Sequence, residues 1–193
     1  MNAELMRLMG NIIRTGVIFA VDATTGCVRV QSGELQTDWL RWNVTRAGAF
    51  NIWAPPALGE QVVIACLGGN PETAMVIGSL YSDSTPPPGS RLQEIVITAP
   101  DGAVLRYDAD AGALSASGMK TARLEASVGV TLDTPVVTCT QHLKAATVEI
   151  TEGGKMTGNI AHSGGSFTSN GVQVDNHQHG GVKPGDSWTR GTT

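Results

Sequence analysis

The second half of this chain lacks the side chains that a domain needs to build an interior. Between residue 90 and Trp188, large aromatic residues are nearly absent, and Ala, Ser, Thr, Val and Gly dominate. Short runs of alternating apolar and polar residues follow one another there, at 95–98, 103–107, 113–117, 126–132, 148–150 and 172–174. Each run supplies a single narrow apolar row. Roughly 85 residues of this kind cannot enclose a core of their own, because one strand has nothing to pack its row against.

Two architectures can supply the missing interior. A solenoid built by one chain needs a regular period and repeated motifs, and the sequence has no clean one. Several identical chains wound around a shared axis tolerate runs of unequal length. A closed cyclic trimer also buries each apolar row against its symmetry mates and removes the sheet edges. The sequence therefore favours a shared threefold axis.

The first 84 residues have the pattern of a small antiparallel barrel. Residues 4–13 predict one short helix with an apolar face. After it the pattern switches to period two, and five strands are predicted, at 15–21, 27–31, 37–42, 61–67 and 74–80. Five short strands without crossover helices are typical of an OB fold. The three prolines Pro86, Pro87 and Pro88 follow, and we expect a stiff linker and a domain boundary there.

Charge and cysteine content exclude several classes of protein. The net charge is −4, and the first 84 residues contain five arginines, no lysine and more acidic than basic groups. Trp39, Trp42 and Trp53 offer a stacking surface for single-stranded nucleic acid, but the positive groove that such binding needs is missing. We expect them to form barrel core or a protein-binding face instead. The three cysteines are far apart in the sequence, which predicts free thiols.

Motifs of known enzyme classes and targeting segments are absent from the sequence. It contains neither a G-x-S-x-G elbow nor an H-E-x-x-H pair. The D-x-D at residues 108–110 lacks the later acidic ligands of a calcium loop, so a polar turn is expected there. The N-terminal residues lack the apolar segment of a signal peptide, and no run of about 18 apolar residues occurs. We expect a product of the cytoplasm without a transmembrane helix.

Two histidines near the C-terminus form the pattern that points to a metal. His177 and His179 follow the strand-like run 172–174, and in an extended chain alternate residues face the same side. Two ligands rarely hold a metal, but three chains on a threefold axis bring six imidazoles to one octahedral point. Such ligation suits iron(II) or nickel(II) better than structural zinc. Solvent-exposed histidines are the alternative, and we expect His142 and His162 to be of that ordinary kind.

Several segments along the chain together resemble one known family. They are residues 59–62 (GEQV), 77–81 (IGSLY), the proline linker, residues 102–114, and His177-Gln-His179 followed by Val182. With these segments the chain resembles baseplate assembly protein V, the central tail spike of contractile-tailed phages. It is also similar in plan to the spike of type VI secretion systems.

This resemblance implies an all-β homotrimer with four parts. Residues 1–84 would form a short helix and an OB-fold domain that docks under the tail tube through a hub protein, and residues 85–89 a proline-rich linker. Residues 90–175 would form an intertwined triple-stranded β-helix, and residues 176–193 a metal-binding tip. One iron ion per trimer would be held octahedrally by His177 and His179 of three chains.

The resemblance also implies a function without catalysis. The protein would be assembled in the host cytoplasm and would reside in the tail baseplate of the virion. Sheath contraction would drive its tip through the host outer membrane. Neither an enzymatic activity nor a nucleic-acid partner is implied.

Two other functions remain open from the residues alone. A metal-dependent β-fold enzyme using His177 and His179 needs a third ligand in the same chain, and none stands at a matching spacing. An OB-fold nucleic-acid-binding protein is disfavoured by the charge. A stable trimer in solution is required of the spike but of neither alternative.

Overall fold

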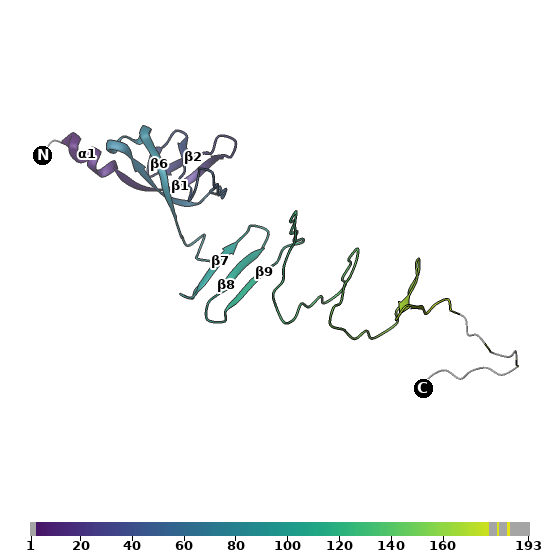
Figure 1. Ribbon diagram of the computed structural model, residues 1–193. Coiled ribbons are helices and arrows are strands. Elements are labelled where there is room, and N and C mark those ends of the chain that lie inside the picture. Colours follow the sequence, from purple (N-terminus) through teal and green to yellow (C-terminus); the bar gives the residue numbers. More distant parts are fainter. Residues whose placement is uncertain (1–2, 178–180, 182–184, 186–193) are drawn as a thin grey trace. The chain divides into compact units, whose positions relative to one another are not determined.

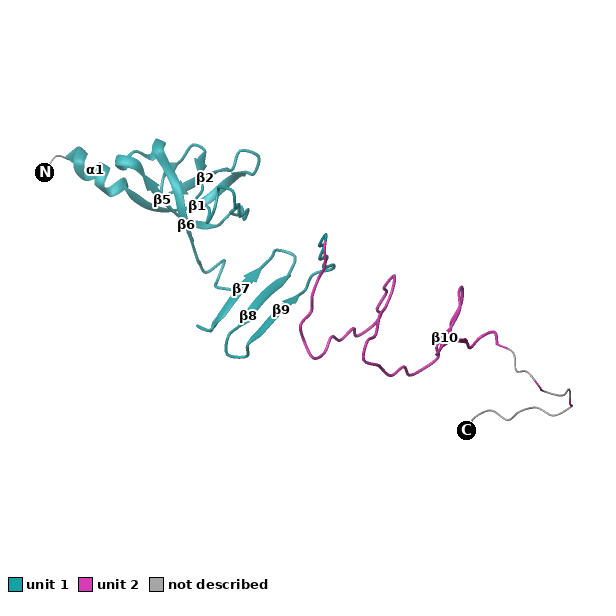
Figure 2. Ribbon diagram, in the orientation of Figure 1, with its two compact units in different colours: residues 1–127 teal, residues 128–193 magenta. Residues whose placement is uncertain are grey.

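The described part of the protein is mostly β, with one short α-helix and two short 3-10 helices, η1 (Leu67–Gly69) and η2 (Pro71–Thr73), in the computed structural model shown in Figure 1. The structure describes residues 3–177, 181 and 185. The chain divides into two compact units, residues 1–127 and residues 128–193 (Figure 2). The helix α1, Ala3–Asn11, agrees with the helix predicted from the sequence. No helix within the described residues is long and apolar enough to cross a membrane.

The first part of unit 1 is a six-stranded antiparallel sheet. Its strands are β1 (Ile13–Asp22), β2 (Cys27–Ser32), β3 (Leu35–Gln36), β4 (Leu40–Arg41), β5 (Gln61–Cys66) and β6 (Ala74–Leu80). They are ordered β3-β2-β1-β5-β6, with β4 also paired to β2. A parallel bridge joins Trp42 to Val76, and the Asn43 N–H donates to the Val76 carbonyl at 2.8 Å. This contact links the end of β4 to β6 and closes the sheet into a barrel, as the sequence predicts.

Alternate residues of the barrel strands face inward and form its core. β2 and β5 both alternate strictly between buried and half-buried residues, which is the period-two pattern read from the sequence. The core consists of Ile18, Val28, Val30, Leu40, Val62, Ile64, Cys66, Ala74 and Val76. Trp42 packs against this core, which confirms one of the three tryptophans as a core residue.

The predicted third strand, residues 37–42, is shorter in the structure, where only Leu40–Arg41 pairs as a strand. Thr37 still follows β2: its N–H donates to the Val30 carbonyl at 3.0 Å, and its hydroxyl accepts from the Val30 N–H at 2.9 Å. A side-chain oxygen thus takes the place of one backbone acceptor in the ladder. The apolar alternation is preserved although the regular pairing is interrupted.

A second, three-stranded antiparallel sheet follows the prolines. It consists of β7 (Glu94–Thr98), β8 (Val104–Asp108) and β9 (Ala113–Ser117), in the order β7-β8-β9. These strands coincide with the first three alternating runs of the second half. The segment expected to be one intertwined β-helix, residues 90–175, therefore begins with a sheet made by a single chain.

Beyond this sheet the chain has almost no regular pairing with itself. Figure 1 shows residues 119–166 without strand arrows, and within this stretch no residue belongs to a strand or helix. The predicted runs 126–132 and 148–150 lie in this stretch. A short hairpin of β10 (Thr168–Ser169) and β11 (Val172–Gln173) ends the described β structure.

Candidate functional site

The first candidate site is His177, which follows the β10–β11 hairpin. The hairpin turns at Asn170 and Gly171, both of which have positive φ. Its closing contacts are the Val174 N–H, which donates to the Phe167 carbonyl at 2.7 Å, and the Phe167 N–H, which donates to the Asp175 carboxylate at 3.3 Å. His177 therefore lies just after a hairpin whose conformation is held by hydrogen bonds.

The His177 imidazole has the kind of backbone contact that metal-binding histidines use. Its Nδ1 lies 3.1 Å from the Val174 carbonyl oxygen. In the tautomer that donates to this carbonyl, Nε2 carries the lone pair that a metal ligand needs. The donor chemistry of His177 thus fits the predicted role in metal binding.

The second predicted ligand, His179, lies outside the described residues. Within the described part of one chain, no three His, Cys, Asp or Glu side chains lie close enough together to hold an ion. A site of six imidazoles takes two from each of three chains, so His177 and His179 as its ligands stay a prediction. His162 lies beside Phe167, with ring centroids 6.0 Å apart.

The D-x-D of residues 108–110 is a turn, as predicted. The Asp108 carboxylate accepts from the N–H groups of Asp110 at 3.1 Å and Ala111 at 3.3 Å, which closes the β8–β9 connection. It also pairs with the Arg91 guanidinium. The hydrogen bond from Arg91 comes first among the contacts that lower the pKa of Asp108. The carboxylate oxygens of Asp108 thus take part in the hydrogen bonds of the turn and in the ion pair.

The barrel surface between β4 and β5 carries exposed apolar side chains, of which only Trp53 was expected from the sequence. The connection between β4 and β5 contains Phe50, Ile52 and Trp53, exposed to 84%, 51% and 62%. A small bridge between Ala47 and Asn51 holds this connection in shape. The Trp53 ring packs against Trp42 at 5.7 Å between centroids. Trp53 therefore belongs to a surface cluster, which suits the protein-binding alternative.

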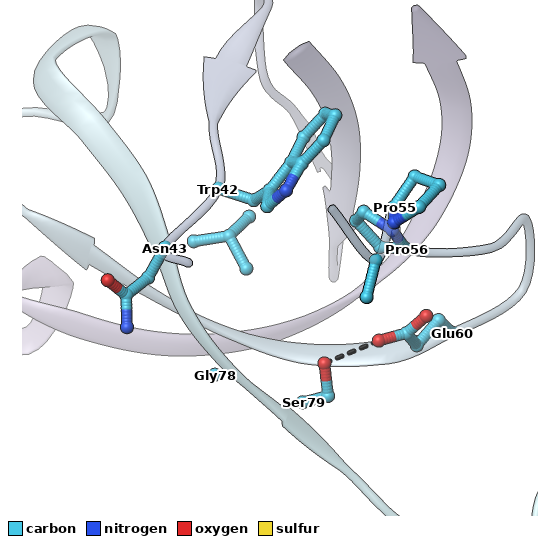
Figure 3. A pocket seen from close by; sticks show the side chains of 9 residues that line it. Trp42, Asn43, Pro55, Pro56, Glu60, Gly78 and Ser79 are labelled. Atoms are coloured by element: carbon cyan, nitrogen blue, oxygen red, sulfur yellow. Dashed lines mark hydrogen bonds between the residues drawn. The ribbon is translucent and has the colours of Figure 1, made fainter. Parts of the chain in front are cut away.

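A pocket of about 330 Å³ lies beside this cluster (Figure 3). Trp42, Pro55 and Pro56 form its apolar wall. On its polar side, the Ser79 hydroxyl donates to the Glu60 carboxylate, which also accepts from the Ala57 N–H at 2.8 Å. The carboxylate fixes the loop before β5 and leaves a slot with one apolar and one polar wall.

The largest candidate site is the stretch of residues 119–166. No backbone–backbone hydrogen bond connects any of these residues to a described residue of the same chain. Met119 is half-buried, and its other large apolar side chains are exposed by about half or more: Leu124, Val128, Val130, Leu132, Val136, Val137, Leu143, Val148, Ile150, Met156 and Ile160. Buried backbone groups need partners and apolar rows need cover. The described residues of one chain supply neither a backbone ladder nor such cover.

Comparison with known proteins assigns both halves of the chain. Residues 14–81, which cover the barrel strands, match the family model described as the type VI secretion system/phage-baseplate injector OB domain. Residues 118–170, which include the unpaired stretch, match the model described as phage spike trimer. The spike protein of Escherichia phage P2 is 43% identical over 199 aligned positions, covering 95% of this chain and 92% of the relative.

The order of parts in the structure agrees with these matches. A closed OB-type barrel precedes a stretch that makes no backbone–backbone hydrogen bond to the described residues of its own chain, and the two family models match these two parts in the same order. Because the similarity to the P2 spike protein extends over nearly the whole chain, it covers the linker and the β7–β9 sheet as well. The chain belongs to the baseplate assembly protein V family, the central tail spikes in the virion baseplate of contractile-tailed phages.

Proposed function

We propose that three copies of this chain form the membrane-piercing spike of a contractile tail. The barrel attaches the spike to the tail hub, and residues 119–175 of three chains wind around one axis as a triple-stranded β-helix. Sheath contraction supplies the work, and the spike supplies a narrow, stiff end that passes through the host outer membrane. The role is structural rather than catalytic.

One observation carries this proposal: the backbone of residues 119–166 makes no backbone–backbone hydrogen bond to any described residue of its own chain. The stretch is nevertheless rich in strand-forming valine, isoleucine and threonine. Two further copies supply both the missing ladder and the cover for the apolar rows. The family description of residues 118–170 as a spike trimer supports the same number of chains.

Intertwining explains how so slender a structure can transmit force. A strand that is laddered to two neighbouring chains cannot fray without breaking hydrogen bonds to both. Stability then belongs to the assembly and not to the single chain. The weak point of such a braid is its end, where strands have fewest neighbours.

A metal at the end of the braid removes that weak point. We place the iron ion at His177 and His179 of the three chains, with the contact of His177 to the Val174 carbonyl fixing the ring. When bound, the ion ties three strand ends together, and its binding free energy adds to the stability of the trimer.

Mass and metal content of the purified full-length protein test this proposal together. Analytical ultracentrifugation at micromolar concentration is expected to give three times the 20.1 kDa chain mass, and elemental analysis one iron per three chains. The double variant His177→Ala, His179→Ala is expected to stay trimeric and to lose the iron, whereas the control His142→Ala, His162→Ala retains it.

The two results separate the parts of the proposal. A wild-type protein that sediments as a monomer contradicts the spike itself. Metal content that is unchanged in the His177→Ala, His179→Ala variant removes these histidines from the site but leaves the trimer intact. Phage particles built with that variant are expected to contract normally and to deliver their genomes less often.

A further inference from the structure

The two faces of the β7–β9 sheet differ sharply in character. The strand register places Ile95 opposite Tyr107, and Tyr107 opposite Leu114. The next row on the same face joins Ile97, Leu105 and Ala116. Five of these six side chains are large and apolar, and they are exposed to 66% (Ile95), 61% (Ile97), 47% (Leu105), 45% (Tyr107) and 79% (Leu114). We call these five residues the apolar sheet face.

The opposite face is polar and is covered in part by the chain itself. Glu94 points to that side with only 4% of its side chain exposed. Its carboxylate accepts from the N–H groups of Ser90 at 3.0 Å and Arg91 at 3.1 Å, and these hydrogen bonds lower the pKa of Glu94. Arg106 lies 3.7 Å from the same carboxylate. Segment 89–91 is thereby fastened along the polar side of the sheet.

Gly89 shows how closely that segment lies against the sheet. A Cβ atom at this position would meet the Glu94 carboxylate oxygen at 2.8 Å and the Val96 side chain at 3.2 Å. The linker therefore ends in a defined contact with the polar face. Segment 89–91 thus covers part of the polar side of this sheet, around Glu94 and Val96, whereas the five residues of the apolar sheet face are all exposed.

Continuity with the trimer region identifies what covers the apolar sheet face. β9 ends at Ser117, and the match to the phage spike trimer begins at residue 118. Three chains that wind together from residue 118 must bring their β9 strands close to one another. An apolar face on each of three neighbouring sheets is buried by closing the three sheets around the same axis. The occupant of the face is therefore a pair of further copies of this chain.

We infer that the β7–β9 sheet is the trimerisation clasp that sets the strand register of the intertwined region. This inference rests on the proposed trimeric spike and adds which segment assembles first. The sheet folds with hydrogen bonds of its own chain, so its association orders few additional residues. Residues 119–166, by contrast, gain pairing only after the chains have met.

Register explains why such a clasp is needed. A slip of one residue moves every side chain of a strand to the opposite face, and slips of two preserve the alternation. The short runs of small β-branched residues after residue 118 contain little that distinguishes one even register from the next. Three sheets locked face to face fix the starting residue of all three strands before the braid forms.

Adjacent residues of β9 provide a matched pair of variants. Leu114 belongs to the apolar sheet face, and Ser115 pairs with Arg106 on the polar face. Both are exposed in a single chain. Leu114→Glu is expected to abolish the trimer peak of the full-length protein in size-exclusion chromatography with light scattering, because three carboxylates would be buried around one axis. Ser115→Glu is expected to remain trimeric.

The tryptophan fluorescence of the barrel shows that each variant has folded. A Leu114→Glu protein that forms as much trimer as the wild type overturns the clasp and leaves the spike standing. A wild-type protein without a trimer peak overturns the spike itself.

A milder substitution tests the same face without disturbing assembly. Leu114→Cys and Ser115→Cys are each placed in a Cys139→Ser background, because Cys139 is an exposed thiol. In the native protein, a maleimide is expected to label the cysteine at position 115 rapidly and the one at position 114 only after unfolding. Equal labelling rates at the two positions show an open apolar sheet face and contradict the inference.

Discussion

Individual side chains of the barrel make hydrogen bonds that stabilise its turns and the irregular parts of its strands. Thr37 replaces a backbone acceptor on β2, and Glu60 fixes the loop before β5. Asp22 does the same for the β1–β2 turn. Its carboxylate accepts from the hydroxyls of Thr24 at 2.6 Å and Thr25 at 2.7 Å and from the Thr24 N–H at 2.9 Å. The hydroxyl of Thr24, then that of Thr25 and the Thr24 N–H, lower the pKa of Asp22 to about 2.

The low pKa of Asp22 predicts an acid-sensitive turn. Because the pKa in the folded state lies below the ordinary value of 3.8, the carboxylate stabilises the fold above about pH 4, and this contribution is lost as the pH falls toward 2. Asp22→Asn is expected to lower the free energy of unfolding of the barrel at pH 6 and to match the wild type near pH 2. Urea unfolding followed by tryptophan fluorescence at both pH values measures the difference.

Glu34→Gln at the neighbouring β2–β3 turn is the control. Its carboxylate makes no hydrogen bond within the described residues, so the substitution is expected to remove no contact of the turn. An Asp22→Asn deficit of the same size at both pH values would show that charge is not what stabilises the turn.

The barrel strands are the elements that the sequence predicts best, because their pattern is local. Gly16 shows how tightly the barrel strands pack. It lies in β1, between β2 and β5. A Cβ atom at this position would lie 2.6 Å from the Gln31 carbonyl oxygen and would also meet the Val30 side chain. Gly78 in β6 has open space at the same atom. Gly16→Ala is expected to reduce barrel stability by about 1–3 kcal/mol through overpacking. Gly78→Ala is expected to change it by less than about 0.5 kcal/mol.

Denaturant unfolding of the two alanine variants compares these elements directly. Both substitutions lower the entropy of the unfolded chain equally, so the comparison isolates the contact made in the folded state. If the two variants unfold at the same denaturant concentration, β1 does not approach β2 as closely as the structure shows.

Elements that depend on a partner chain are the ones that the sequence could not place. β1, β2, β5 and β6 were predicted within two residues at each end, since each alternates against neighbours in its own barrel. The runs 126–132 and 148–150 have the same alternation but no strand partner among the described residues of the chain. Alternation says which side chains share a face and not which strand lies beside them. Their register is therefore beyond a single sequence.

The candidate metal site likewise combines features of one chain with features that depend on other chains. Sequence spacing identified His177 and His179, and the hairpin before them accounts for the position of His177. From the sequence, the apolar sheet face could be recognised only as three separate alternating runs. The turns that place these runs side by side in one sheet depend on local glycines and on Asp108. Gly102 and Gly112, both with positive φ, lie in the two connections.

At the scale of the whole molecule, the two parts of the chain differ in whether they have a core of their own. The barrel has a closed core. Residues 119–166 have exposed apolar rows and no backbone–backbone hydrogen bond to the described residues of the chain, and they match a family model described as a trimer. In the proposed spike, two further copies of the chain supply the partners that this stretch lacks. The β7–β9 sheet lies between the two parts: it pairs within one chain and, by our inference, is covered by two others.

Amide hydrogen exchange of the intact protein, resolved along the chain, tests this central assignment most directly. Unpaired amides exchange at the rate of an unstructured peptide, whereas amides in a stable ladder are protected. In the proposed trimer, residues 119–166 are expected to be protected to an extent comparable with β1 and β5. Exchange of residues 119–166 at unprotected rates, in a sample whose β1 and β5 are protected, would contradict it.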